Sequence, residues 1–323
     1  MGAVGWLVAG LAALILGAEV VVRYGSLLAR RLRVPPMIIG LTVVSIGTSA
    51  PELAVGIDAM RVNAGSLAVG NIAGTNIVNL LLILGLSAAI RTIEFDRRTL
   101  RLDLPAMAAV AVLLYLLSLD GQLQLWEGVP LVLAAIGYSG LLVWYTRRWA
   151  RVVPHEVAAL PREHVPRPGP LVSVGHASLL VLGIAIIVVG ADWLVDGAVE
   201  LARISGVSDA FIGLTVVAIG TSAPELMTAL VSTIRGSRDI AIGNLIGSSV
   251  YNLTLILGVP VLVANGSGPI EASLLHVDLP VTVAVCLLCV PLFLTGRKLS
   301  RLEGVGFVVA YLAYLGYLIV ART

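Results

Sequence analysis

Apolar residues run through this chain in long stretches that recur from one end to the other, with short polar segments between them. A stretch of about 20 apolar residues has the length that a helix needs to cross the hydrocarbon core of a bilayer. Within that core, helices satisfy their own backbone hydrogen-bonding groups. The pattern predicts an all-α polytopic membrane protein with ten transmembrane helices, at 3–29, 37–61, 66–90, 102–119, 126–146, 173–201, 210–234, 240–264, 274–296 and 303–321.

The composition excludes a soluble domain. Of the 323 residues, 58% are hydrophobic and 12% are charged, whereas a soluble domain carries about 25% charged residues. The net charge is only +2, and the basic residues lie in short loops, which argues against a nucleic-acid partner. The sequence contains no phosphate-binding loop and no sizeable soluble segment, which argues against an ATP-driven pump. We expect no enzyme activity, no cofactor and no obligatory protein partner.

The basic residues also predict an orientation. Odd-numbered loops between the predicted helices contain 17 of the 21 Lys and Arg residues. Loops rich in Lys and Arg remain in the cytoplasm. We therefore expect a multi-pass protein of the cell inner (plasma) membrane with both termini on the non-cytoplasmic side. The fifth loop, residues 147–172, is basic and Pro-rich and is predicted to be a cytoplasmic linker between residues 1–146 and 173–323.

The two halves are related by an internal repeat. At an offset of 173 residues, 18–85 align with 191–258 without a gap. Each half contains five predicted helices, and an odd number reverses the direction in which the second copy enters the membrane. The chain is therefore expected to consist of two inverted-topology five-helix repeats, with repeated motifs at 40–85 and 213–258.

One repeated stretch predicts broken helices. The sequence Gly-Thr-Ser-Ala-Pro-Glu-Leu occupies 47–53 and again 220–226, each within an apolar segment. The proline lacks an N–H, so a carbonyl about one turn earlier loses its helical donor. A simple kink would not need the glutamates, and an ionisable side chain near the bilayer centre costs about 2.5–3.5 kcal/mol. We therefore expect Glu52 and Glu225 to bind a hard cation together with nearby carbonyls and hydroxyls, as Na⁺ and Ca²⁺ prefer oxygen ligands.

A second repeated motif follows each break. The pattern Gly-Asn-x-x-Gly-Thr/Ser-x-x-x-Asn occupies 70–79 and 243–252. Thr75 and Asn79 are four residues apart and therefore share a helix face, as do Ser248 and Asn252. The glycine pairs predict close helix packing, which would bring the polar face towards the glutamate. The alternative is that these polar side chains only join neighbouring helices.

These paired motifs resemble the α-repeats of the calcium/cation antiporter superfamily, most closely those of the prokaryotic sodium/calcium exchangers. The resemblance implies one central site in which Glu52 and Glu225 are ligands of both Ca²⁺ and Na⁺. The further ligands that it implies are the main-chain oxygens of Thr48 and Thr221 for Ca²⁺; Ser49, Thr75 and the Ser45 carbonyl for one Na⁺ site; Ser222, Ser248 and the Ala218 carbonyl for its mirror image; and Asn79 and Asn252 at the middle.

One position departs from the family pattern. Relatives often carry Asp where this chain has Asn252, so the site here holds two carboxylates and two amides. The expected function is antiport of Na⁺ against Ca²⁺ by alternating access, with an H⁺/Ca²⁺ exchanger as the alternative because two protons would also neutralise two carboxylates. A cation channel is less expected, because the site comes from two halves of one chain and not from a ring of subunits.

Other acidic residues lie in or near the predicted helices, namely Glu19, Asp58, Asp192 and Asp196. Glu19 and the two aspartates of the sixth helix are expected to pair with Arg23 or Arg203 near helix ends. Asp58 is a candidate for an ion access path. The resemblance also implies that the first and sixth helices move against the rest.

Overall fold

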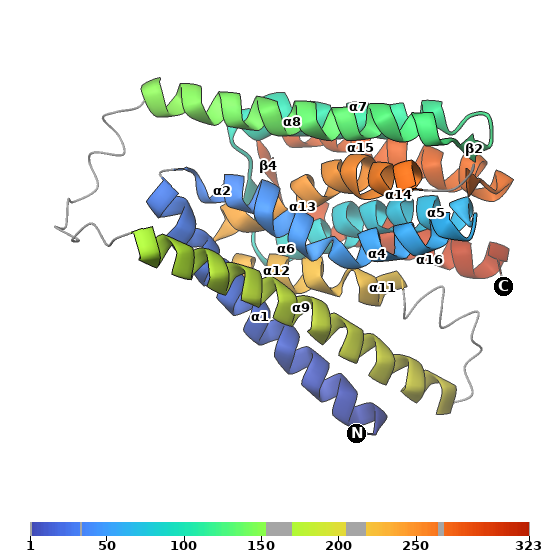
Figure 1. The fold of residues 1–323 in the computed structure, drawn as a ribbon, viewed down its shortest axis with the longest axis horizontal. Helices are drawn as coiled ribbons and strands as arrows, with labels where there is room; N and C mark the ends of the chain where they lie inside the picture. The colour runs from blue at the N-terminus through green and yellow to red at the C-terminus, as the bar shows by residue number, and fades with distance from the viewer. Residues whose placement is uncertain (1, 33, 153–169, 205–217, 264–267, 323) are drawn as a thin grey trace.

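The computed structural model describes residues 2–32, 34–152, 170–204, 218–263 and 268–322. Most of the predicted linker 147–172 and the first part of the predicted helix 210–234 lie outside the described residues. The described part of the chain is helical almost throughout (Figure 1).

Helices of the first half lie close to their predicted positions. Several contain π-helical turns, labelled η, in which backbone hydrogen bonds reach one residue further than in an α-helix. Their bounds are α1 Ala3–Leu32, α2 Pro36–Ile39, η1 Gly40–Val44, α3 Ser45–Thr48, α4 Ala50–Arg61, α5 Gly65–Ile77, η2 Val78–Ile83, α6 Leu84–Ile90, η3 Thr99–Asp103, α7 Leu104–Leu117 and α8 Leu125–Val152.

Helices of the second half follow the same order, with π-helical turns at corresponding places. Their bounds are α9 Pro170–Ile204, α11 Ala218–Thr221, α12 Ala223–Ile234, α13 Arg238–Tyr251, η6 Asn252–Ile256, α14 Leu257–Val263, η7 Leu274–Asp278, α15 Leu279–Leu294 and α16 Arg301–Arg322.

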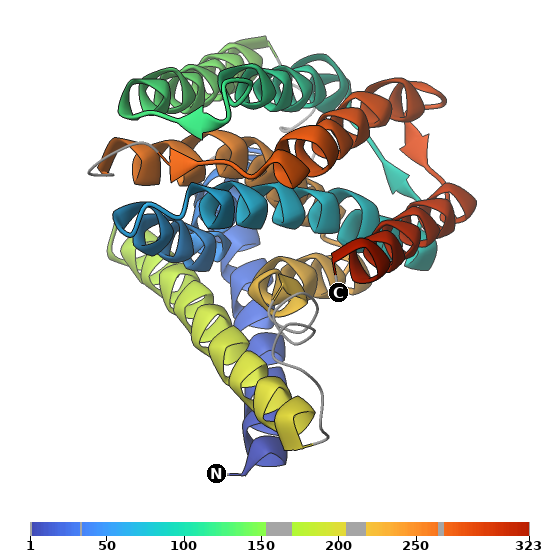
Figure 2. The same ribbon diagram turned by 90° about the vertical axis from the view of Figure 1, so that its right-hand side faces the viewer.

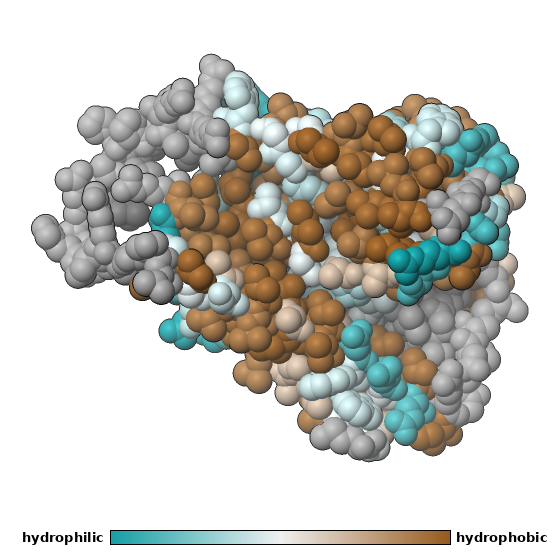
Figure 3. Space-filling view, in the orientation of Figure 1, coloured by the Kyte–Doolittle hydropathy of each residue, from teal (hydrophilic) through white to brown (hydrophobic). Residues whose placement is uncertain are grey.

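Within the described residues, eight helices are long and apolar enough to cross a membrane. A ninth is added if the bent pair 36–48 and 50–61 is counted as one span, since the two parts meet at an angle of 44°. Apolar side chains cover much of the outer surface, and the space-filling view shows them as a broad brown face (Figure 3). Such a surface is stable only against lipid or another apolar phase.

Helices α1 and α9 form a pair of their own (Figures 1 and 2). They lie side by side and extend away from the remaining helices at one end. Glycines allow the close approach, because a Cβ at Gly10 would lie 2.5 Å from the Leu194 backbone nitrogen. A Cβ at Gly190 would lie 2.8 Å from that of Ala13. The pair is therefore joined by backbone-to-backbone packing along small residues.

The prediction of an all-α chain omitted four short strands. Strand β1 (Ile93–Glu94) pairs with β4 (Lys298–Leu299), and β2 (Gln122–Leu123) pairs with β3 (Gly268–Pro269), both antiparallel. Each ladder joins one strand from the first half to one from the second. The ladders thus fasten the two halves together outside the helices.

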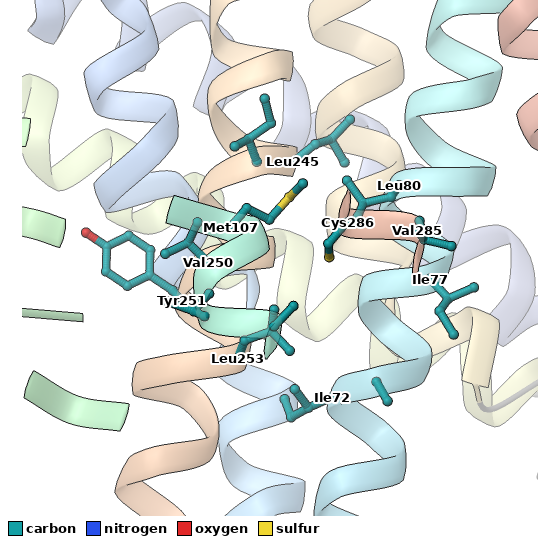
Figure 4. Close-up of a cluster of buried hydrophobic side chains, with 14 of the residues drawn as sticks. Ile72, Ile77, Leu80, Met107, Leu245, Val250, Tyr251, Leu253, Val285 and Cys286 are labelled. Carbon is teal, nitrogen blue, oxygen red and sulfur yellow. The ribbon is translucent and has the colours of Figure 1, made fainter. Parts of the chain in front are cut away.

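The two runs that carry the polar motifs form the centre of the bundle. In the most apolar windows of Gly65–Ile90 and Asp239–Val263, 78% of residues are buried, against 17–44% in the other candidate spans. Buried apolar side chains from both runs belong to one cluster, together with Met107 on α7 and Cys286 on α15 (Figure 4). This packing holds the polar motifs away from lipid.

Candidate site at the two helix breaks

In each half, a serine separates two consecutive helices. Ser49 has φ −84° and ψ 14°, and Ser222 has φ −87° and ψ 5°. Pro51 and Pro224 occupy the first turn of the new helices α4 and α12, where a missing N–H is tolerated. Each break therefore ends one helix and begins another within the bundle.

Each break places a glutamate in the first turn of the new helix. Glu52 lies in the first turn of α4, and Glu225 in the first turn of α12. A helix N-terminus carries a partial positive charge, which stabilises a carboxylate there. Both side chains are 0% exposed. They lie close enough to repel each other when both are ionised, so a cation between them would relieve the repulsion.

Hydrogen bonds cross between the halves at this point. The Ser49 hydroxyl donates to Glu225 Oε1 over 3.3 Å. The Thr48 hydroxyl donates to the side-chain oxygen of Asn244 over 3.3 Å, and that of Ser45 to the backbone oxygen of Asn244 over 3.0 Å. Asn244 is part of the repeated motif on α13 but was given no role in the sequence-based prediction. It holds the first break against the second half.

The glycine pair on α13 packs closely, as predicted. A Cβ at Gly243 would lie 2.5 Å from the Met37 carbonyl oxygen, and a Cβ at Gly247 would lie 2.4 Å from Ser45 Oγ. The glycine pair on α5 differs. A Cβ at Gly70 would contact only the Leu274 side chain, at 3.3 Å, and one at Gly74 would meet nothing within 4 Å. The prediction of close packing is therefore wrong for Gly74 within the described structure.

Within the described residues, many buried polar atoms around the glutamates have no hydrogen-bond partner. They include both carboxylate oxygens of Glu52, the second oxygen of Glu225, and the whole side-chain amides of Asn79 and Asn252. The hydroxyls of Ser222 and Ser248 likewise have no hydrogen-bond partner within the described residues. An unsatisfied buried group costs about 1–3 kcal/mol, and more if charged. The oxygen atoms among these groups are able to bind a cation.

The other predicted ligands in the described residues are buried or line a cavity beside the glutamates. Thr75 is 3% exposed, and Ser45, Thr48 and Ser49 are 0% exposed. Thr221 ends α11 and lines a cavity together with Thr75. Ala218 begins α11, and its side chain lies outside the described residues. Asn79 and Asn252 lie in the π-helical turns η2 and η6, which are common at functional sites.

No group of three or more His, Cys, Asp or Glu side chains gathers in the part of the chain that the structure describes. Thiolates and imidazoles are the usual ligands of zinc and copper. The site instead offers two carboxylates with amide, hydroxyl and carbonyl oxygens. Such a donor set suits Na⁺ or Ca²⁺.

The other acidic residues have different surroundings from those expected. Glu19 Oε2 lies 2.9 Å from Arg235 Nε, so its predicted pairing with Arg23 or Arg203 is wrong. The side chain of Arg203 lies outside the described residues. Asp58 forms an exposed ion pair with Arg61 at 3.8 Å.

Asp192 and Asp196 form no ion pair within the described part of the chain. Their expected pairing with Arg23 is therefore wrong, because Arg23 contacts the ring of Tyr24 with its guanidinium carbon 5.7 Å from the ring centroid.

The structure also reveals a repeated pair that the sequence-based alignment missed. Asp103 accepts a hydrogen bond from the Tyr138 hydroxyl, at 3.1 Å, and Asp278 accepts one from the Tyr314 hydroxyl. The sequence Asp-Leu-Pro occurs at 103–105 and 278–280, an offset of 175 and not 173. The signal was present, but the loops before it differ in length and shift the register.

Comparison with known proteins places the chain in a family. The family described as sodium/calcium exchanger protein matches residues 2–144 and 175–320. Sodium/calcium exchanger MaX1 of Methanosarcina acetivorans is 31% identical over 343 residues, covering 96% of each chain. Inner membrane protein YrbG of Escherichia coli is 38% identical over 287 residues, covering 88% of this chain and 87% of its own.

A solved structure agrees with this placement. The sodium/calcium exchanger from Methanococcus jannaschii superposes with a TM-score of 0.82 at 30% identity, over 97% of both chains. The fold and the length are thus similar over nearly the whole chain. The chain belongs to the sodium/calcium exchanger protein family.

Proposed function

We propose that this protein is a secondary active antiporter that exchanges Na⁺ for Ca²⁺ across a membrane by alternating access. The observation that carries the proposal is the burial of two glutamates with unsatisfied carboxylate oxygens, Glu52 and Glu225, at matching helix breaks. Membership of the exchanger family supports the choice of ions. The ions are the transported substrates, and the protein needs neither a catalytic residue nor a cofactor for this activity.

We assign the ligands by the repeat. Glu52 and Glu225 bind Ca²⁺ with the main-chain oxygens of Thr48 and Thr221. Two Na⁺ sites flank them, one made by Ser49, Thr75 and the Ser45 carbonyl, and the other by Ser222, Ser248 and the Ala218 carbonyl. Asn79 and Asn252 lie between them. The unsatisfied hydroxyls of Ser222 and Ser248 and the unsatisfied amides support this assignment.

Charge counting predicts an electrogenic cycle. One Ca²⁺ neutralises two ionised glutamates, whereas three Na⁺ leave a net charge of +1. Moving one charge through 100 mV is worth about 2.3 kcal/mol. Exchange of three Na⁺ for one Ca²⁺ would therefore respond to membrane voltage.

The proposed topology has ten membrane-crossing helices in two inverted five-helix repeats, 1–146 and 173–323, with the second and seventh helices broken at the site. The 44° bend between 36–48 and 50–61 supports the first break. The two β-ladders support the repeat, since each joins the loop after the third predicted helix of one half to the loop after the fourth predicted helix of the other half. The basic loops support a location in the cell inner membrane with both termini outside the cytoplasm, and a cytoplasmic linker at 147–172.

Ion flux in proteoliposomes tests the function. Vesicles loaded with Ca²⁺ should release it when a Na⁺ gradient is imposed and should ignore a pH gradient. Release that follows pH and ignores Na⁺ would instead indicate an H⁺/Ca²⁺ exchanger.

Two substitutions test the site. The attraction between unit charges 4 Å apart is about 4 kcal/mol in a protein-like medium, and Ca²⁺ carries two charges, so Glu52→Gln or Glu225→Gln should weaken Ca²⁺ binding by at least about 1000-fold. Asp58→Asn is the matched control, because it lies on the same helix as Glu52 but is exposed. Retained Ca²⁺ flux in both glutamine variants would refute the site.

A further inference from the structure

A cavity of about 490 Å³ reaches the proposed ion site from one end of the molecule. It is far larger than the cavity volume of roughly 10–15 Å³ that one water needs. Its lining follows one face of α5, from Ser66 at the exposed start to Val78 beside the proposed ligand Asn79. Twelve residues of helix span about 18 Å. The cavity also contacts Thr75 and Thr221, so it leads from the surface to the proposed ligands.

A buried carboxylate lines this route. Asp278 is 3% exposed and belongs to the cavity wall together with the exposed Glu271 and the half-buried Ser66. Glu271 and Asp278 are seven residues apart, so Asp278 lies about 10 Å further along its helix. Tyr314 donates a hydrogen bond to Asp278 and lines the same cavity. A buried carboxylate within a membrane bundle is costly, and here it faces a space that water and ions can enter.

The corresponding place in the first half differs in charge and in packing. Asp103, which matches Asp278, forms a buried ion pair with Arg98 at 3.3 Å. The position that matches Arg98 is occupied by Ser273 in the second half. Tyr251, which matches Val78, packs its ring against Tyr138 at 5.8 Å between centroids.

We infer that Asp278 is a cation-binding residue of the access route, and that it attracts hydrated Na⁺ or Ca²⁺ from one face of the membrane before the ion reaches Glu52 and Glu225. This inference rests on the proposed antiport function. The carboxylate supplies negative charge where the ion still keeps its water. Glu271 adds a second negative charge at the mouth, which raises the local cation concentration.

The test compares the two faces of the membrane. Right-side-out and inside-out vesicles from the same cells give the Ca²⁺ and the Na⁺ concentrations for half-maximal exchange on each face. Asp278→Asn should raise the Ca²⁺ value about tenfold and the Na⁺ value about threefold, because attraction scales with ion charge. Both shifts should occur on the face that bears Ser66 and Glu271. The other face should change less than about twofold, and the maximal rate should be retained, since the site glutamates that supply most of the binding charge are intact.

Two further variants distinguish a binding role from a structural one. Ser273→Arg places a basic residue where Arg98 stands in the other half, and should weaken binding on the same face as Asp278→Asn. Tyr138→Phe removes the matching hydroxyl in the first half and should shift neither face selectively. Equal shifts on both faces, or no shift in Asp278→Asn and Ser273→Arg, would overturn the inference. An unmodified protein without Na⁺-driven Ca²⁺ flux would instead refute the proposed function itself.

Discussion

The two glycines that match each other across the repeat, Gly74 and Gly247, should respond in opposite ways to the same substitution. They are 173 residues apart and occupy the same place in the repeated motif. An added Cβ at Gly247 would lie 2.4 Å from Ser45 Oγ, 2.7 Å from the Leu41 carbonyl oxygen and 2.8 Å from the Leu41 Cα. An added Cβ at Gly74 would meet nothing within 4 Å.

The magnitude follows from these distances. Ordinary contacts of a Cβ lie at 3.4–4 Å, so Gly247→Ala requires about 1 Å of separation between α13 and the helix that carries Leu41. Two of the three neighbours are backbone atoms, which move only with their whole helix. Overpacking of this kind costs about 1–3 kcal/mol. Gly74→Ala has no such clash and gains up to about 1 kcal/mol from the higher helix propensity of alanine.

Thermal unfolding of the purified variants in detergent measures the difference. One kcal/mol corresponds to roughly 2–4 °C in proteins of 150–250 residues, so Gly247→Ala should unfold several degrees below the unmodified protein. Gly74→Ala should unfold at the same temperature or slightly above it. Equal destabilisation by both substitutions would refute the reasoning from packing, as would a Gly247→Ala variant of unchanged stability.

Two other predictions concern charge. Asn252→Asp adds a third carboxylate to the site and should raise Ca²⁺ affinity about tenfold, because repulsion from Glu52 and Glu225 offsets most of the added attraction. Isothermal titration of Ca²⁺ and Na⁺ measures this, and unchanged affinity for both ions would remove Asn252 from the site. Glu19→Gln breaks the pair with Arg235 that joins α1 to the end of α12. Since exposed ion pairs contribute about 0.2–1 kcal/mol, the maximal exchange rate of Glu19→Gln should change by less than about fivefold. The double variant with Arg235→Gln should show the same rate as Glu19→Gln alone. Additive effects in that cycle would indicate that the pair does not act as a unit.

Local patterns predicted the elements that depend on nearby residues. Helices α4 and α12 begin at the Pro-Glu positions of the repeated motif, because the effect of a missing N–H acts within one helical turn. The membrane-length helices follow from apolar length alone.

Partners far apart in the chain were not predictable in this way. Thr48 meets Asn244, which is 196 residues away, and Glu19 meets Arg235, which is 216 residues away. The prediction for Glu19 gave Arg23 or Arg203 near helix ends as its partner. The packing of α1 against α12 brings a different arginine within reach. The β-ladders were not predicted either, because two-residue strands carry no periodic signal of their own and pair with strands far away in the chain.

The repeat itself could be found in the sequence, but the difference between its copies could not. The two motifs are nearly identical, yet Gly247 is packed against backbone and Gly74 borders a cavity. If both copies had the same surroundings, the central glutamates would be equally accessible from both faces, as in a channel, or closed to both. A carrier must at any moment admit ions from one face only, so its two halves must differ in packing while they match in sequence. The contrast between Gly74 and Gly247, and between Asp278 and Asp103, is the asymmetry that such a mechanism requires, and it favours an antiporter over a cation channel for this chain.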